Sequence, residues 1–76
     1  MSKQIEPVYR LLGAKVEMMR NTLGWTQDDL AKRIGLSRAS IANLELGRQR
    51  LMMHHVEKIA NAFNTTTKHL MKGIWT

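Results

Sequence analysis

The sequence predicts an all-α fold, arranged as one small, compact domain of five helices. Apolar residues recur three and four positions apart along most of the chain, which is the spacing of a helix face, and no segment has the alternating pattern of a strand. Glycine and short polar stretches separate these periodic segments. With 76 residues, 43% of them hydrophobic, the chain can form a single modest core. We therefore expect one domain over 1–76, with a flexible arm at 1–6 and a tail at 74–76.

The first helix is expected to begin at Pro7 and to end before Gly24. Proline suits the first helical position because an N–H group would have no partner there. A stripe of apolar residues follows and faces inward until glycine stops the helix. The stripe consists of Val8, Leu12, Val16, Met19 and Leu23. This pattern indicates that the first helix is scaffold.

The second helix is expected over about 26–34. Thr26 supplies a hydroxyl N-cap, and the two aspartates of the first turn suit the positive end of the helix dipole. Leu30 and Ile34 share one face of this helix. The small side chain of Ala31 lies between them, so another helix can pack closely at this point.

A third helix is expected over about 37–46, after a turn at Gly35. Glycine adopts the left-handed conformation that ends a helix without a Cβ penalty, and Ser37 can cap the helix that follows. Ile41 and Leu44 bury its inner side. The residues then left facing outward are Ser37, Arg38, Ala39, Ala42 and Asn43. Two short helices that meet at a glycine turn have the spacing of a DNA-binding helix-turn-helix.

Two more helices are expected to close the core. A fourth helical face is traced by Met53, Val56, Ile59, Ala60 and Phe63, and Asn64 offers a C-cap. A fifth helix is expected near 66–72 and ends at Gly73. Ile74, Trp75 and Thr76 remain as the tail.

The chain is strongly basic. Twelve Lys and Arg residues against six Asp and Glu give a net charge of +6, with a pI near 10.4. This balance is expected of a nucleic-acid binder, although many small basic proteins do other things. The placement of the charge says more, because five cations lie in or beside the second and third helices, where they can reach phosphates. They are Lys32, Arg33, Arg38, Arg48 and Arg50.

Several other classes of protein are disfavoured by the composition. The absence of cysteine excludes disulfides, thiol nucleophiles and cysteine-ligated zinc, which fits a reducing compartment. The N-terminus lacks an apolar signal core, and no segment approaches the roughly 18 apolar residues that span a bilayer. We therefore expect a cytoplasmic protein that does not span a membrane.

Neither a metal site nor a catalytic site is expected. Methionines at helical spacing are more often core or interface filler than ligands, and His54 and His55 are adjacent, so they point about 100° apart and cannot chelate as an i, i+4 pair. No serine or cysteine nucleophile stands in a recognisable setting, and no glycine loop would cradle a phosphate. We expect a non-enzyme with no cofactor and no small-molecule ligand.

The stretch from about Val8 to Gly73 resembles the helix-turn-helix family of lambdoid phage repressors and Cro proteins, which includes restriction-modification controller proteins and many xenobiotic-response-type regulators. Several positions agree in register, namely Gln27, Ala31, Gly35, Ile41, Leu44, Glu45 and Gly47. The alternative is an ordinary helical hairpin in which alanine and glycine merely permit close packing. The resemblance implies a compact five-helix lambda-repressor-like domain whose third helix enters the major groove of DNA.

Four residues of the third helix would then read base edges: Ser37, Arg38, Ala39 and Asn43. Arg38 presents a planar fork that fits guanine O6 and N7, and Asn43 can pair with adenine. Ala39 can touch a thymine methyl group, or it simply leaves room for a neighbour. Arg38 is the strongest candidate of the four.

Other residues are expected to anchor the domain on phosphates or to hold its fold. Gln27, at a helix N-terminus, corresponds to a phosphate-binding glutamine of the family, and Ser40, Arg48 and Arg50 are further phosphate candidates. The alternative for Arg48 and Arg50 is a solvated basic loop. Arg20 and Glu45 match positions that form a buried ion pair in some phage repressors, which implies a structural role.

A homodimer is expected because one recognition helix reads only a few base pairs, and two half-sites normally lie about one helical turn apart. The candidate interface is the fifth helix with the tail, where apolar residues exceed what a monomer needs to expose. These residues are Leu70, Met71, Ile74 and Trp75, some of which can instead cap the core.

Double-stranded DNA is thus the expected partner, bound at a palindromic operator by a transcriptional repressor or a restriction-modification controller. Activation would also need a contact with RNA polymerase, which the motif does not specify. The alternative is an antitoxin that neutralises a protein toxin and represses its own operon. A basic amphipathic membrane-surface protein is a weaker alternative, since the positive charge is not confined to one helix face.

Overall fold

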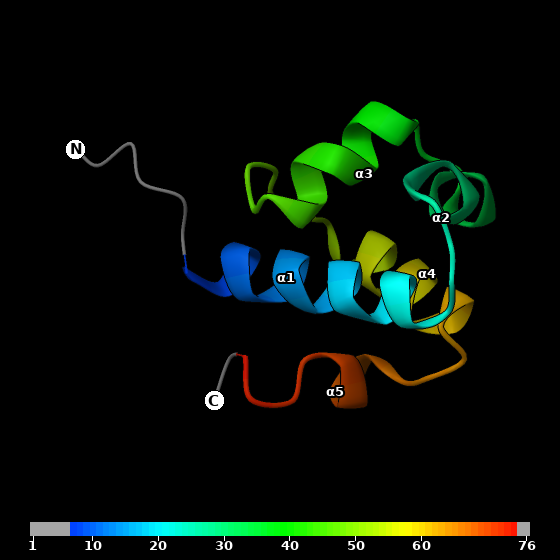
Figure 1. Ribbon diagram of the computed structural model, residues 1–76. Helices are drawn as coiled ribbons and strands as arrows, with labels where there is room; N and C mark the ends of the chain where they lie inside the picture. The colour runs from blue at the N-terminus through cyan, green and yellow to red at the C-terminus, as the bar shows by residue number, and fades with distance from the viewer. Residues whose placement is uncertain (1–6, 75–76) are drawn as a thin grey trace.

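Helices account for all the regular structure in the computed structural model, which describes residues 7–74. In chain order they are α1 (Pro7–Thr22), α2 (Gln27–Ile34), α3 (Arg38–Glu45), α4 (Met53–Ala62) and α5 (Thr67–Leu70) (Figure 1). The expected all-α fold with five helices is confirmed. The arm predicted at 1–6 and the tail residues Trp75 and Thr76 lie outside the described residues.

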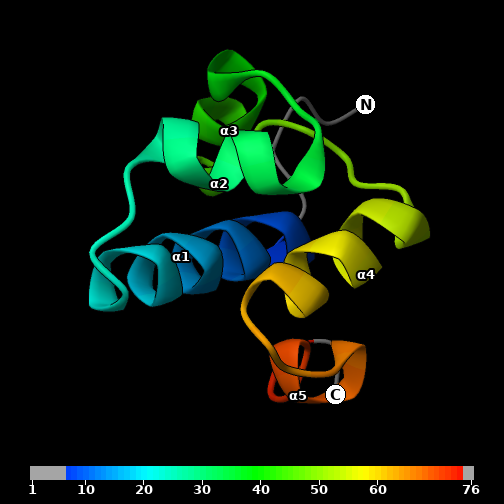
Figure 2. The ribbon, with the colours of Figure 1, turned by 90° about the vertical axis from the view of Figure 1, so that its right-hand side faces the viewer.

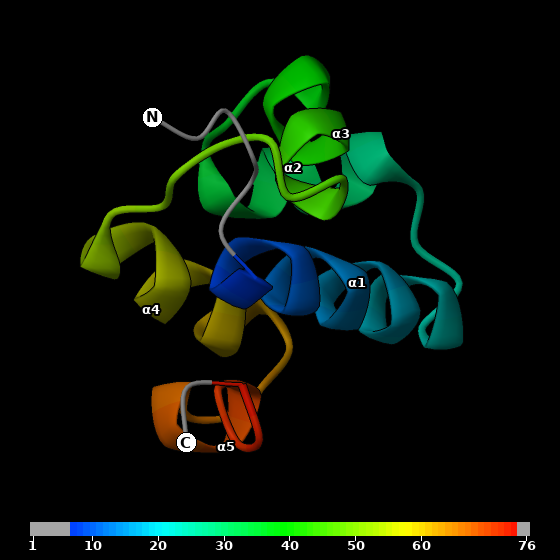
Figure 3. The same cartoon turned by 90° about the vertical axis from the view of Figure 1, so that its left-hand side faces the viewer.

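The helices form three layers. The α2–α3 pair covers one side of α1 and α4, and α5 lies on the opposite side (Figures 2 and 3). Contacts between elements join α2 to α3, α1 to α3, α2 to α4, and α4 to α5. As a result α3 and α5 lie at opposite faces of the molecule (Figure 1).

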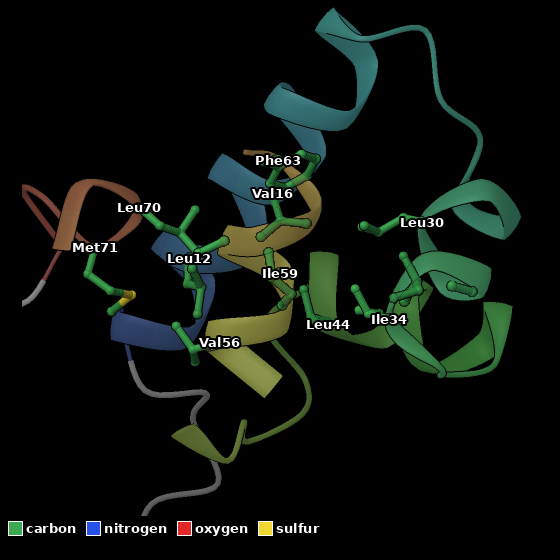
Figure 4. Packing of buried hydrophobic residues seen from close by; sticks show 13 residues of the cluster. Leu12, Val16, Leu30, Ile34, Leu44, Val56, Ile59, Phe63, Leu70 and Met71 are labelled. Atoms are coloured by element: carbon green, nitrogen blue, oxygen red, sulfur yellow. The ribbon is translucent and has the colours of Figure 1, made fainter. Parts of the chain in front are cut away.

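One hydrophobic core lies between these layers (Figure 4). Every helix contributes to it, so the periodic faces predicted from the sequence do converge. Ala31 is 1% exposed, so it lies in the packed centre of α2's inner face as expected. The buried set is Leu12, Val16, Leu30, Ala31, Ile34, Ile41, Leu44, Val56, Ile59, Ala60, Phe63, Leu70 and Met71.

The local signals that delimit α2 and α3 act as expected. The Thr26 hydroxyl accepts a hydrogen bond from the Asp29 N–H, and the Asp29 carboxylate accepts one from the Thr26 N–H, which is a complete capping box. Gly35 ends α2 at φ 75°, in the left-handed region, and Ser37 caps α3 by accepting from the Ser40 N–H. These caps fix the angle at which α3 leaves α2.

Three expectations about helix faces and lengths are wrong. Leu23 and Met53 are 50% and 53% exposed, because Leu23 follows the last residue of α1 and Met53 is the first residue of α4. The fifth helix is also shorter than 66–72, because Thr66 is its N-cap and Met71 already its C-cap.

A close approach of α1 to α3 was not foreseen. A Cβ atom on Gly13 would lie 2.7 Å from the main-chain oxygen of Glu45, and closer still to that of Leu44. The backbones of α1 and the end of α3 therefore touch where only glycine fits. The signal in the sequence was a glycine inside an otherwise helical pattern.

Candidate nucleic-acid interface

The outer side of α3 is the surface on which sequence analysis placed the base-reading residues. Ile41 and Leu44 anchor the helix in the core at 0% and 1% exposure. The four predicted base readers, Ser37, Arg38, Ala39 and Asn43, are all exposed. Since α3 lies at the edge of the molecule (Figure 1), the structure brings these side chains together on one accessible helix.

The hydroxyl groups of Ser37 and Ser40 are partly committed within α3. Ser37 Oγ accepts from the Ser40 N–H at 3.1 Å and donates to Ser40 Oγ at 3.0 Å. A serine hydroxyl has one donor and two acceptor positions. In this arrangement Ser37 can offer a base edge an acceptor, while Ser40, half-buried, still has its own hydrogen to donate to a phosphate.

The predicted ion pair of Arg20 and Glu45 is present and buried. Arg20 Nε lies 2.6 Å from Glu45 Oε2 and Nη2 lies 3.0 Å from Oε1, so the contact is bidentate. Arg20 Nη1 also donates to the Trp25 carbonyl oxygen at 2.7 Å. The hydrogen bond to Glu45 raises the pKa of Arg20 above its ordinary value. The pair ties α1 to Glu45, the last residue of α3.

The nitrogen and the oxygen of the Gln27 side-chain amide each form a hydrogen bond to another side chain. Its Nε2 donates to Glu45 Oε1 at 3.1 Å, and its Oε1 accepts from Arg38 Nη1 at 3.3 Å. The expectation that this side chain and the free backbone N–H groups at the start of α2 together clamp a phosphate stays a prediction.

The cations singled out in the sequence fall into two groups. Arg38, Arg48 and Arg50 are exposed on α3 or in the loop that follows it. Lys32 instead forms an exposed ion pair with Asp28 at 3.3 Å. Arg33 lies 4.0 Å above the ring of Trp25. Both cations of this second group, Lys32 and Arg33, belong to α2.

Sequence analysis missed the aromatic contact that holds Arg33 in place. The Trp25 ring stacks on Phe63 with centroids 5.6 Å apart, and the Arg33 guanidinium covers Trp25 at 4.0 Å. This stack links the α1–α2 connection to the end of α4. Arg33 is therefore held by packing, and we assign it no part in the interface.

The predicted dimer interface requires a correction. Leu70 and Met71 are 0% and 2% exposed because α5 packs them into the protein's own core, so these side chains have no surface to offer a second copy. Ile74 is half-buried and packs against the same core, and Trp75 lies outside the described residues. Among the described residues, the exposed large apolar side chains are those of Leu11, Met18, Leu23, Leu46, Met52 and Met53.

Within residues 7–74 no group of three His, Cys, Asp or Glu residues is placed to hold a metal ion. The rings of His54 and His55 are in contact, with centroids 4.1 Å apart. Burial and the neighbouring charge of His54 lower the pKa of His55 below its ordinary value. Among the described helices, none is long and apolar enough to span a membrane.

Comparison with known proteins agrees with this geometry. A helix-turn-helix family model matches residues 16–70. The competence pilus inhibition repressor of Acinetobacter baylyi is 36% identical over 59 residues, which cover 78% of this chain and 54% of that protein. The chain spans about half the length of the curated relatives it matches.

Two solved structures have the same fold. The clp gene regulator ClgR from Corynebacterium glutamicum superposes with a TM-score of 0.83 at 20% identity, covering 93% of this chain and 91% of that one. The restriction-modification controller protein C.AhdI from Aeromonas hydrophila gives a TM-score of 0.77 at 24% identity, covering 82% and 90%. With the family model matched from the second half of α1 to the end of α5, the chain belongs to the helix-turn-helix family.

Proposed function

We propose that this chain is a sequence-specific DNA-binding transcription regulator that inserts α3 into the major groove. The observation that carries the proposal is the exposed outer side of α3 within a matched helix-turn-helix segment. A major groove about 12 Å wide admits one α-helix. The net charge of +6 favours approach to the phosphate backbone.

Sequence preference would arise from side chains near the N-terminal half of α3. Arg38 would pair with guanine O6 and N7 and Asn43 with adenine, while Ala39 would lie against a thymine methyl group. Ser37, whose hydrogen is given to Ser40, would accept from an exocyclic amine of cytosine or adenine. Each good bidentate contact contributes about 1 to 3 kcal/mol of discrimination.

Affinity would come largely from phosphates. Gln27, Ser40, Arg48 and Arg50 are the side-chain candidates, together with the backbone N–H groups at Gln27. Arg48 and Arg50 follow Gly47, which adopts a left-handed φ of 74° just after the C-cap of α3. The loop they occupy would lie along the DNA backbone beside the groove.

We further propose that the regulator binds a two-fold symmetric operator as a homodimer, because two half-sites give the affinity and specificity that one helix lacks. The tail at Ile74 and Trp75 and the exposed apolar side chains of Leu11 and Met18 on α1 are the surfaces to test. Sedimentation would compare a chain that lacks residues 74–76 with a Leu11→Ser, Met18→Ser variant. The variant that sediments as a monomer would identify the surface that forms the dimer.

Repression is the mode we favour, since the A. baylyi relative is named a repressor. Blocking a promoter needs only occupancy of the DNA. The other mode is control of a restriction-modification operon, since C.AhdI is named a restriction-modification controller protein. If this chain also activated transcription, it would need a contact to RNA polymerase. The native operator, fused to a reporter gene, would distinguish the two by the sign of the response.

The experiment that tests the proposal is selection of bound duplexes from a random library, followed by footprinting on the enriched sequence. We expect one enriched motif with inverted symmetry and protection of two half-sites about one helical turn apart. Enrichment of no motif, with binding that depends only on salt, would refute sequence-specific regulation by this domain.

A further inference from the structure

A basic cleft lies between the end of α2 and the second half of α4. These two helices are in contact and lie side by side in Figure 2. The cleft measures about 600 Å³ and is lined by Lys32, Arg33, Ile34, Gly35, Lys58, Asn61 and Ala62. Three of the lining side chains are cations and none is a carboxylate, so the cleft attracts anionic groups.

All three cations of the cleft are able to take a carboxylate from another molecule. Lys32 pairs with Asp28 at 3.3 Å, but both side chains are exposed, and an exposed ion pair is weak enough to be exchanged. Trp25 covers one face of the Arg33 guanidinium, whose N–H groups donate in the plane of the group, at its edge. Lys58 forms no ion pair with any residue of 7–74.

The end of α2 adds hydrogen-bond acceptors to the same cleft. The last carbonyl groups of an α-helix have no partners within the helix. Here the N–H groups of Gly35 and Leu36 both donate to the carbonyl oxygen of Ala31. In the described part of the chain, no backbone N–H beyond α2 donates to the carbonyl oxygens of residues 32–34. The cleft therefore offers cations and main-chain acceptors together.

This combination suits an acidic polypeptide better than a phosphate. A phosphate group accepts hydrogen bonds, and the carbonyl oxygens at the negative end of α2 would repel it. An acidic peptide carries both complements, because its carboxylates accept from cations and its backbone N–H groups donate to carbonyl oxygens. None of the side chains proposed to contact bases or phosphates lines the cleft. A peptide can therefore occupy it while α3 is on DNA.

We propose that the cleft between α2 and α4 is a docking site for an acidic segment of another protein. The carboxylates of this segment pair with Lys32, Arg33 and Lys58, and its N–H groups donate to the last carbonyl groups of α2. Asn61 adds a side-chain amide that both donates to and accepts from a peptide group. The inference goes beyond the proposed function, because it concerns a protein partner and not the operator.

The test is a titration with a fluorescent synthetic peptide of about eight residues in which glutamate and alanine alternate, so that an extended chain presents its carboxylates on one side. At near-physiological salt, charges more than about 8 Å away are screened. The double variant Lys32→Ala, Lys58→Ala should bind the peptide about tenfold more weakly than wild type. The matched control is Lys68→Ala, Lys72→Ala, which removes two exposed lysines at α5 and should change the affinity by less than about twofold.

Equal losses of affinity in the two double variants would overturn the proposal, because net charge alone would then hold the peptide. Absence of binding to wild type would overturn it as well. In NMR spectra, the peptide should shift the amide signals of residues 32–35 and 58–62, and shifts centred elsewhere would contradict the docking site. Tripolyphosphate is the second probe. If it bound the cleft more tightly than the peptide does, the cleft would be a phosphate site and the assignment to a polypeptide would be wrong.

A further titration, on the complex of the protein with the selected duplex, tests whether the cleft is separate from the DNA interface. The peptide should bind the complex within about twofold of its affinity for the free protein, since DNA phosphates beyond about 8 Å are screened. The two double variants should also bind the duplex equally well. Displacement of the peptide by the duplex would contradict this separation. Failure of the peptide to bind leaves the proposed regulator standing, and failure to enrich a motif leaves the peptide result standing.

Discussion

Truncating Glu45 to alanine should destabilise the domain severely, because the Arg20 guanidinium would be left buried without its carboxylate. Arg20 is 8% exposed and would lose two of its three hydrogen bonds, keeping the one to the Trp25 carbonyl. Removing one partner of a buried ion pair typically costs about 3 to 5 kcal/mol. A domain of this size has only about 4 to 11 kcal/mol of stability in total.

The measurement is thermal and urea unfolding followed by circular dichroism. At about 4 to 8 °C per kcal/mol, Glu45→Ala should lower Tm by at least about 12 °C. Glu57→Ala, at an exposed site on α4, is the control and should change stability by no more than about 0.5 kcal/mol. A double variant, Arg20→Met with Glu45→Leu, should recover much of the loss because no charge stays buried. The reasoning is refuted if Glu45→Ala melts where Glu57→Ala does.

Three further perturbations test other parts of the structure. Gly13→Ala should lower the free energy of unfolding by about 1 to 3 kcal/mol, because its methyl group meets main-chain oxygens of α3; an unchanged urea midpoint would show that the two helices are further apart. The hydrogen bond from the Thr26 N–H lowers the pKa of Asp29, so this carboxylate stabilises the fold above its unfolded pKa of about 3.9, and the contribution is lost as pH falls through the folded pKa. Asp29→Asn should therefore reduce the loss of unfolding free energy at acid pH. The same loss in wild type and variant would contradict the capping box. Arg48→Ala should weaken binding to all duplexes alike and reduce the salt slope by about one, whereas a change in base preference would contradict its assignment to phosphate.

The elements of this fold were predictable where the signal is local. Thr26 and Ser37 are caps because a hydroxyl next to free N–H groups needs no distant partner, and Gly35 ends α2 for an equally local reason. Ala31 was predictable because helical spacing places it at the centre of an apolar face. These residues define the helix-turn-helix, and hence the outward face of α3.

The remaining features depend on contacts between distant parts of the chain. In a helix as short as α5, periodicity cannot distinguish a core face from an interface, so Leu70 and Met71 were assigned to a dimer contact although they are buried. The resemblance placed Gln27 on phosphate, and it did not show that this side chain also meets Glu45 and Arg38, which come together only in the folded chain. The phosphate and base contacts themselves stay predictions.

The most direct measurement is a fluorescence-anisotropy titration of the library-selected duplex and of a scrambled duplex of the same composition, at near-physiological salt. If α3 reads base edges, the protein should bind the selected duplex at least about 1,000-fold more tightly than the scrambled one. Arg38→Ala should lower this ratio of affinities by about tenfold or more. Equal affinities for the two duplexes, both falling steeply with salt, would show that the basic surface attracts DNA without reading it.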